Sequence, residues 1–290
     1  MLAIVGTVPD PDFPLVEGEV GLQDGELVVD GRRVEVNRGT PALAAAAIKA
    51  CEVLGAPAPF VYLVGDIGMG QGSRGLYEYL ANVLRGTSFR SLTFHYLQPD
   101  VDGHNRVLFA VEEMAQRPLL IADAGFMYAA KMSGQAESFD LFTPDAGELA
   151  FLADEDAPHP FYTRGFILHE ENRVPEQVSR AYKHGNAARL LLIKGAQDSV
   201  ADRSGILKTV SHPSEEAMEA IGGTGDTLTG LVAALAQHGL GNGMDLEQAA
   251  VIAARVNRLA GSYARPTPAT RILDIVDTIP RALEEVLRSA

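Results

Sequence analysis

The chain of 290 residues is 47% hydrophobic, and its 38 acidic and 24 basic side chains give a formal charge of −14. This length and composition suffice for a large core in one α/β domain that spans residues 1–290. The excess of acidic side chains argues against nucleic acid or an anionic membrane as a partner. The chain has one cysteine and no apolar run long enough to span a membrane, which predicts a soluble cytoplasmic protein.

Short apolar runs alternate with helical segments along the chain. Near its start, Asp30-Gly31 separates two short apolar stretches, so residues 1–36 are expected to contribute a small N-terminal β-hairpin. Five later runs have the continuous apolar character of buried parallel strands, at residues 60–64, 92–96, 119–122, 139–142 and 190–193. Helical spacing is found at residues 41–54 (with Thr40 as N-cap), 76–84, 105–115, 146–153, 176–183, 227–237, 246–260 and 279–287. The alternation predicts a mostly parallel central sheet covered by helices.

The most informative motif is Gly222, Gly223, Thr224, Gly225 and Asp226, directly before a long apolar helix. Glycines let backbone N–H groups face an anion, and a helix N-terminus adds about half a positive charge. Asp226 then stands where a substrate hydroxyl would meet a phosphoryl group. A plain glycine-rich turn with an acid in the first helical turn explains the same spacing equally well.

Loops at the carboxyl ends of parallel strands build ligand sites, which directs attention to two further segments. The loop after residues 60–64 holds Asp66, Gly68 and Gly70, and it forms either a second ligand-contacting cradle or a flexible turn. Asp123 follows residues 119–122, where its carboxylate is placed either to contact substrate or metal or to cap a helix.

Two other loops carry charged candidates. Asp145 and Glu148 are three residues apart and either hold Mg²⁺ through water or form a capping box. Lys194 and Gly195 follow residues 190–193, where Lys194 either meets a phosphate or is solvated at the strand end. The seven histidines show no metal-ligand spacing, which argues against a zinc site. His104 is expected in a loop after a strand, where it either lines the pocket or, as we favour, is solvated.

The order of three motifs, "FTPDAGE", "LLIKGAQDSVADRSG" and "IGGTGDTLTGLVAALAQHGL", resembles the ribokinase-like superfamily, and within it the ATP- or ADP-dependent NAD(P)H-hydrate dehydratases. The resemblance implies a three-layer α/β/α fold, with a nucleotide between the Lys194–Gly195 loop and the Gly222–Asp226 loop. It implies Asp226 as general base, phosphate binding by Gly222 to Gly225, and Mg²⁺ near Glu148. We expect substrate contacts from Asp66, Gly68, Gly70, Asp123 and Asp145.

Two departures from the dehydratase pattern keep other functions open. Members usually have a His after the Thr-Pro pair, where this chain has Asp145, and a second Asp where it has Gly125. A small-molecule kinase for a sugar or vitamin precursor would use the same first step, and a nucleotide-binding sensor would keep the fold without turnover. In each case the expected partner is a small molecule, and a homo-oligomer is expected.

Overall fold

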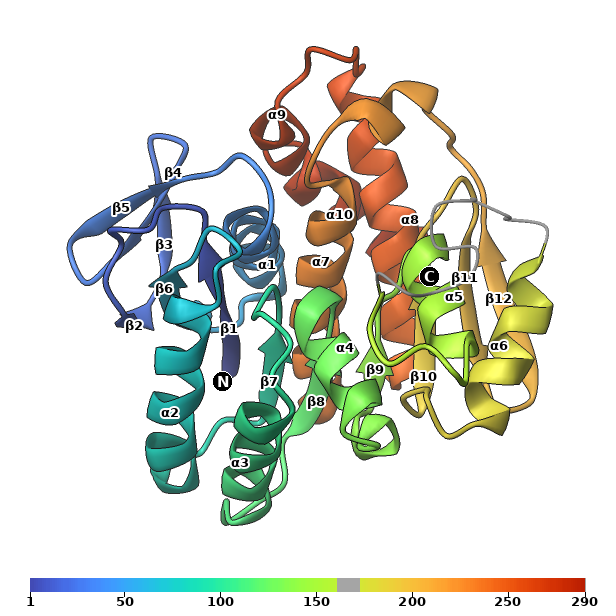
Figure 1. Ribbon diagram of the computed structural model, residues 1–290. Helices are drawn as coiled ribbons and strands as arrows, with labels where there is room; N and C mark the ends of the chain where they lie inside the picture. Colours follow the sequence, from blue (N-terminus) through green and yellow to red (C-terminus); the bar gives the residue numbers. More distant parts are fainter. Residues whose placement is uncertain (161–172, 290) are drawn as a thin grey trace.

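The computed structural model describes residues 1–160 and 173–289, and its centre is a nine-stranded sheet in the order β12-β11-β10-β9-β8-β7-β1-β6-β2 (Figure 1). The strands from β10 to β6 in this order are parallel, and antiparallel strands lie at both edges. The strands are β1 Leu2–Val8, β2 Val16–Glu19, β6 Phe60–Gly65, β7 Ser91–Phe94, β8 Leu119–Ala122, β9 Leu141–Phe142, β10 Leu190–Ile193, β11 Asp198–Asp202 and β12 Gly205–Val210. The mostly parallel sheet expected from the sequence is confirmed.

The N-terminal segment contributes to two sheets. The expected hairpin is present as β4 Glu26–Val29 and β5 Arg32–Glu35, and β3 Gly21–Gln23 completes a separate three-stranded antiparallel sheet. The apolar run at the start of the chain, however, forms β1, which lies between β6 and β7 in the main sheet and is buried along its whole length. The segment is therefore both a decoration and a central part of the core.

Helices cover both faces of the sheet (Figure 1). Along β1 the side chains alternate, so that Ile4 belongs to the core with α1, α7, α8 and α10, while Ala3 and Val5 belong to the core with α2 to α6. The α-helices are α1 Thr40–Leu54, α2 Gln71–Val83, α3 Val101–Glu112, α4 Ala124–Met132, α5 Ala146–Ala153, α6 Val174–Lys183, α7 Thr224–Asn242, α8 Leu246–Ala264, α9 Ile272–Val276 and α10 Ile279–Ser289. This is the α/β/α layering that the sequence resemblance implied.

Two helix starts differ from expectation in ways that matter for the site. The N-cap of α1 is Gly39, and Thr40 is already the first helical residue, because Gly39 adopts a positive φ of 68° that ends the preceding loop. The helix α4 was not predicted; it begins directly after Asp123, whose side chain accepts a hydrogen bond from the Ala124 N–H. Its first turn therefore lies at the carboxyl end of β8.

Helices α1 and α7 pack closely where Gly230 faces α1. A Cβ at this position would lie 2.1 Å from the Leu43 carbonyl oxygen and 3.2 Å from the Ala46 side chain. Only a glycine permits this approach, and the approach places the starts of both helices side by side. In the described part of the chain, none of the helices combines the length and apolar character that a membrane span requires.

Candidate active site

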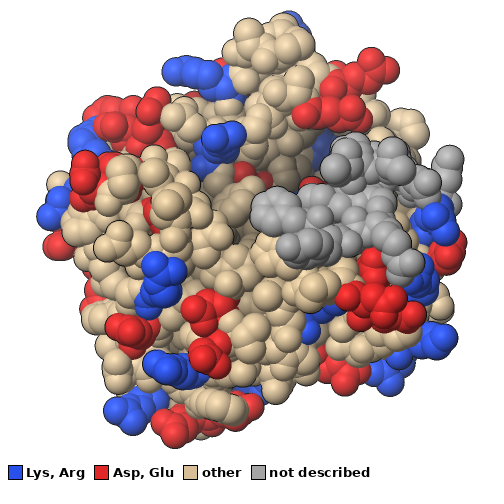
Figure 2. Space-filling view, in the orientation of Figure 1, with Lys and Arg blue, Asp and Glu red and all other residues tan. Residues whose placement is uncertain are grey.

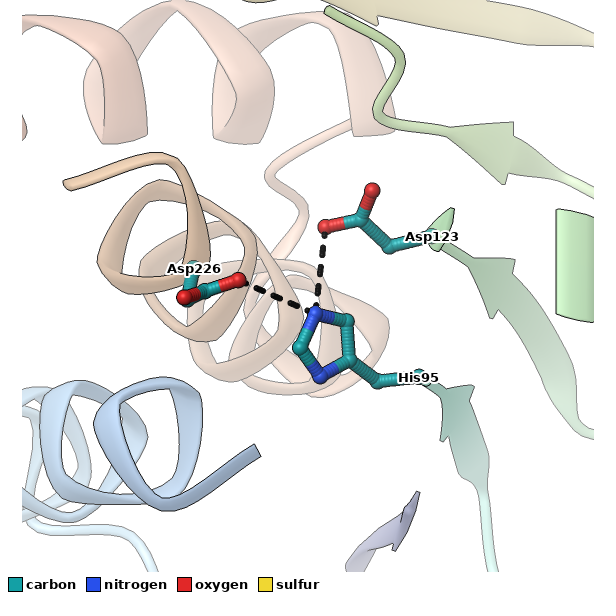
Figure 3. A group of neighbouring side chains, drawn as sticks. All are labelled: His95, Asp123 and Asp226. Carbon is teal, nitrogen blue, oxygen red and sulfur yellow. Dashed lines mark ion pairs between the residues drawn. The ribbon is translucent and has the colours of Figure 1, made fainter. Parts of the chain in front are cut away.

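Three side chains from distant parts of the sequence meet at the carboxyl edge of the sheet (Figure 3). His95 follows β7, Asp123 follows β8, and Asp226 lies in the first turn of α7. His95 Nε2 is 3.1 Å from Asp226 Oδ1 and 3.7 Å from Asp123 Oδ2, and all three residues are buried. In the space-filling view the molecular surface is hollowed between the N-terminal strands and the C-terminal helices, with acidic atoms visible in the hollow (Figure 2).

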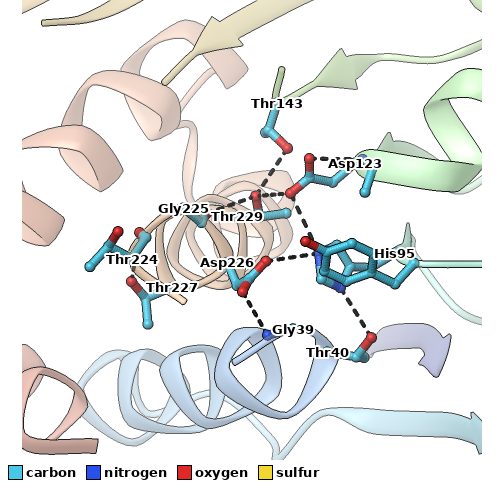
Figure 4. A network of polar contacts seen from close by, with 12 residues as sticks. Gly39, Thr40, His95, Asp123, Thr143, Thr224, Gly225, Asp226, Thr227 and Thr229 are labelled. Carbon is cyan, nitrogen blue, oxygen red and sulfur yellow. Dashed lines mark hydrogen bonds and ion pairs between the residues drawn. The ribbon is translucent and has the colours of Figure 1, made fainter. Parts of the chain in front are cut away.

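Asp226 is held from two sides. Its Oδ2 accepts a hydrogen bond of 2.6 Å from the backbone N–H of Gly39, at the start of α1, and its Oδ1 faces His95 (Figure 4). Burial acts to raise the pKa of Asp226, but the His95 contact, the charge of Lys194 and the Gly39 N–H together lower it below the ordinary value. The carboxylate is therefore ionised and able to accept a proton.

Asp123 forms a buried ion pair with Lys194. The Lys194 ammonium donates to both carboxylate oxygens at 2.9 Å, and Thr229 Oγ1 lies 2.7 Å from Asp123 Oδ2. Burial favours the neutral amine, but the carboxylates of Asp123 and Glu148 raise the pKa of Lys194 above its ordinary value. The expectation that Lys194 is merely solvated at the strand end is wrong, whereas the helix-capping role considered for Asp123 is confirmed.

Asp145 and Glu148 form the capping box that their spacing allowed. Each side chain accepts from the other residue's backbone N–H, both at 2.8 Å. Glu148 is also buried, and its Oε1 accepts a hydrogen bond of 2.7 Å from the Tyr128 hydroxyl. Burial is the main cause that raises the pKa of Glu148, to about 8. The capping-box alternative for Glu148 is confirmed. Its contact with Mg²⁺ through water stays a prediction.

The Gly222–Asp226 segment forms the glycine turn from which α7 begins. Gly223 is the N-cap of α7 with φ 104°, and a Cβ there would lie 2.9 Å from the Ile272 side chain. The next N–H groups belong to the first helical turn, which has no intrahelical acceptors for them. The Asn257 side chain donates to the Thr224 carbonyl oxygen and so fixes the turn against α8. This geometry fits a phosphate oxygen at Thr224 and Gly225.

The loop of residues 65–73 uses its carboxylate internally. Asp66 accepts hydrogen bonds from the backbone N–H groups of Gly68, Gly70 and Ser73 and from the Ser73 hydroxyl. These bonds lower the pKa of Asp66 although burial acts in the opposite direction. The loop leaves Ile67 exposed, and substrate contacts by Asp66, Gly68 and Gly70 stay a prediction.

Several site residues escaped the sequence reasoning. His95 follows a strand, as Asp123 does, and this position was the signal that could have identified it. It was overlooked because the histidines were considered only for their spacing from one another. Arg258 of α8 was also missed; it donates to Asp198 Oδ2 at 2.7 Å and to the Gly195 and Ala196 carbonyl oxygens at 2.9 Å, which anchors the loop after β10.

The expectation for His104 is wrong. The residue is fully buried in α3, its ring centroid lies 4.9 Å from that of Phe126, and Ser133 Oγ lies 3.1 Å from its Nδ1. Burial lowers the pKa of His104 to about 4. His104 is therefore a neutral core residue, and the apolar residues that follow it along α3 place it there.

The His95, Asp123 and Asp226 group also has the donor atoms of a metal site. Each residue offers one ligand atom, and in the described part of the chain these atoms lie within 4.8 Å of one another. The sequence argued against a zinc site because its histidines are scattered, with no pair at metal-ligand spacing. The Lys194 ammonium supplies a positive charge to Asp123 without a metal.

An open depression of about 670 Å³ lies away from this group, at the amino edge of the sheet. It is formed by the end of α6, the β11–β12 turn and Glu137, which precedes β9. Because ligands of open α/β sheets bind at the carboxyl edge, this depression is not the candidate active site.

Comparison with known proteins identifies relatives by sequence. A carbohydrate-kinase family model described as NAD(P)H-hydrate dehydratase matches residues 100–281. An uncharacterized protein of Methanocaldococcus jannaschii is 38% identical over 229 residues, which cover 79% of this chain and 92% of that protein. A bifunctional NAD(P)H-hydrate repair enzyme of Pyrobaculum aerophilum is 30% identical over 172 residues, which cover 59% of this chain and 30% of the enzyme. This chain thus spans less than a third of that bifunctional relative.

Solved structures share the fold. A ribokinase-like superfamily protein of Enterococcus faecalis has a TM-score of 0.58 at 14% identity, covering 98% of this chain and 87% of that one. An ADP/ATP-dependent NAD(P)H-hydrate dehydratase of Bacillus subtilis, co-crystallized with ATP and Mg²⁺, has a TM-score of 0.56 at 15% identity, covering 98% and 89%. At these identities the likeness establishes a ribokinase-like fold.

Proposed function

Because the chain belongs to the carbohydrate-kinase family described as NAD(P)H-hydrate dehydratase, we propose that it restores NAD(P)H from its hydrate with ATP or ADP. The hydrate hydroxyl is phosphorylated first, and phosphate is then eliminated. The observation that supports this proposal best is the ionised Asp226 at the start of α7, beside the glycine turn. A base and an anion-binding turn in one helical turn suit the transfer of a phosphoryl group to a hydroxyl.

The chemistry assigns a role to each part of the site. Asp226 takes the proton of the hydrate hydroxyl while the oxygen attacks the terminal phosphorus of the nucleotide. The N–H groups from Gly223 to Gly225 stabilise the charge on the transferred phosphoryl group. Phosphorylation is needed because hydroxide is a poor leaving group, whereas the lone pair of the ring nitrogen can expel phosphate.

Three parts of the site would hold the nucleotide and Mg²⁺. The turn that begins at Gly223 suits phosphate oxygens. Arg258 anchors the loop that contains Gly195. This loop lies beside the turn, because Lys194 packs against Gly225. Glu148 is the residue that would hold Mg²⁺ through water, and the ion would neutralise nucleotide charge. The dehydratase of Bacillus subtilis that was co-crystallized with ATP and Mg²⁺ supports this choice of cofactors through its fold.

The test is to incubate the purified protein with Mg²⁺, hydrated NADH and either ATP or ADP, and to follow the absorbance of reduced nicotinamide. Wild-type protein is expected to restore NADH in a nucleotide-dependent reaction. Asp226→Asn removes the base without changing side-chain size, and should slow the reaction by about 10²–10⁴-fold while nucleotide binding persists.

Two other results would redirect the proposal. Nucleotide binding without NADH recovery would favour a kinase with another hydroxyl acceptor, and a panel of sugars and vitamin precursors would then identify the acceptor. Nucleotide binding with no transfer to any acceptor, and no difference between wild type and Asp226→Asn, would favour a sensor.

A further inference from the structure

Nε2 of His95 faces the carboxylates of Asp226 and Asp123, and Asp226 is the nearer of the two. The His95 side chain is fully buried, and among the described residues Nε2 forms no aligned hydrogen bond, although Asp226 Oδ1 lies at 3.1 Å. A buried polar atom without a hydrogen bond is costly, so its presence beside the predicted base calls for a functional explanation. From this contact we propose that His95 receives the proton that Asp226 takes from the substrate. The inference rests on the proposed function of the site.

The imidazole is held in a fixed orientation. Thr40 Oγ1 lies 3.0 Å from Nδ1, and the Tyr96 ring meets the imidazole edge-on with centroids 4.2 Å apart. When the Nδ1 proton is donated to Thr40, Nε2 is the nitrogen that takes up a proton, and the imidazolium so formed donates to Asp226 Oδ1. The fold thus provides a proton acceptor at one hydrogen-bond length from the base.

The charged groups around His95 suit a proton that arrives at Nε2. Asp226 faces it from α7 and Asp123 from the end of β8, and Lys194 pairs with Asp123. On the strand side, the neighbouring titratable group is Tyr96. Two carboxylates against one ammonium leave one negative charge, which an imidazolium neutralises. A metal ion would instead have to compete with Lys194 for both oxygens of Asp123.

The dehydration requires a base to accept a proton twice. A single carboxylate can do so only if it loses the first proton before the second transfer. In the first step the substrate O–H bond breaks and Asp226 takes the proton, while the new O–P bond forms and the P–O bond to the nucleotide breaks. Asp226 then passes this proton to Nε2 of His95. In the second step the C–O bond breaks and phosphate leaves with the electron pair. The electrons of the neighbouring ring C–H bond then form the C=C bond, and Asp226 takes that proton. Both protons return to solvent after product release.

The decisive variant is His95→Gln, with His238→Gln near the far end of α7 as the matched control. The rates of nucleotide consumption and of NADH recovery are measured separately as functions of pH. His95→Gln should slow the reaction by about 10²-fold and change the shape of the pH profile, because the group that receives the proton from Asp226 is absent. It should also recover fewer NADH molecules per nucleotide consumed, because the second proton transfer is impaired. Unchanged pH profile and stoichiometry in His95→Gln would overturn the proposal.

A readout without turnover separates this proposal from the proposed function. In ¹⁵N NMR spectra of the histidines, the signals absent from His95→Gln identify His95. In a series of spectra recorded at different pH values, Nε2 should be found both with and without its proton, and Asp226→Asn should change the balance because the neighbouring negative charge is lost. A fixed protonation state throughout the series would overturn the relay even if NADH is restored. Zn²⁺ binding that shifts the His95 signals in nucleotide-free protein would overturn it in favour of a metal centre. Normal titration in a protein that restores no NADH would support the relay and contradict the dehydratase function alone.

Discussion

The ammonium of Lys194 lies 2.9 Å from both carboxylate oxygens of Asp123, and this pair joins the end of β10 to the end of β8. The Asp123 side chain is 1% exposed and the Lys194 side chain 14% exposed. Removing one partner of such a pair leaves an uncompensated buried charge, which is far more costly than removing both. The pair therefore fixes the geometry of the sheet edge on which the candidate site stands.

Lys194→Met should lower the free energy of unfolding by about 3–5 kcal/mol, because Asp123 stays buried without its cation. Urea denaturation measures the change. Adding Asp123→Asn to this variant should restore part of the loss, since both charges are then absent. A single variant as stable as the wild type would show that the pair contributes no net stabilisation.

Glu148 should make stability depend on pH in the metal-free protein. Burial raises its pKa from 4.5 to about 8, so the folded state keeps a proton that the unfolded chain has released. The contribution to stability is complete below the unfolded value and is lost as pH rises through about 8.

Urea unfolding in the presence of a chelator, repeated at acidic, neutral and alkaline pH, measures this dependence. Glu148→Gln stays neutral and should lose less stability than the wild type as pH rises. The exposed Glu112→Gln, on the outer side of α3, is the control and should follow the wild type. Parallel curves for wild type and Glu148→Gln would contradict the raised pKa.

Arg258→Lys should weaken nucleotide binding without removing the positive charge. A lysine cannot donate at once to Asp198 and to the carbonyl oxygens of Gly195 and Ala196, so the loop after β10 loses its anchor. The loss of one charge-assisted hydrogen bond costs about 1.5–3 kcal/mol, which corresponds to a dissociation constant about ten- to a hundredfold higher. Calorimetric titration with nucleotide measures it. Arg255→Lys on the exposed face of α8 should bind as the wild type does.

Gly230→Ala should separate α1 from α7. The added methyl group meets the Leu43 carbonyl oxygen, and overpacking of this kind costs about 1–3 kcal/mol. Thermal unfolding should show a lower midpoint, and the rate of NADH recovery should fall because Gly39 moves away from Asp226. Gly75→Ala, at an open position in α2, should instead raise stability by about 0.5–1 kcal/mol. Equal midpoints for the two variants would contradict the close contact.

The sequence by itself determined the architecture. Continuous apolar runs such as residues 119–122 and 190–193 became strands with the expected bounds, and the capping box of Asp145 and Glu148 formed as its spacing allowed. These features depend on local sequence patterns, so they can be predicted from adjacent residues alone. The run at residues 2–8 has the same pattern, but only pairing with β6 and β7 gave it a central place.

Tertiary structure alone decided the composition of the candidate site. His95, Asp123 and Asp226 are separated by dozens of residues, and no local signal indicates that the ends of β7 and β8 meet the start of α7. Their meeting follows from the strand order and from the close packing at Gly230, which places Gly39 and Asp226 together. Burial then set the charges, because the pKa of a carboxyl or imidazole depends on neighbours that only the folded chain supplies.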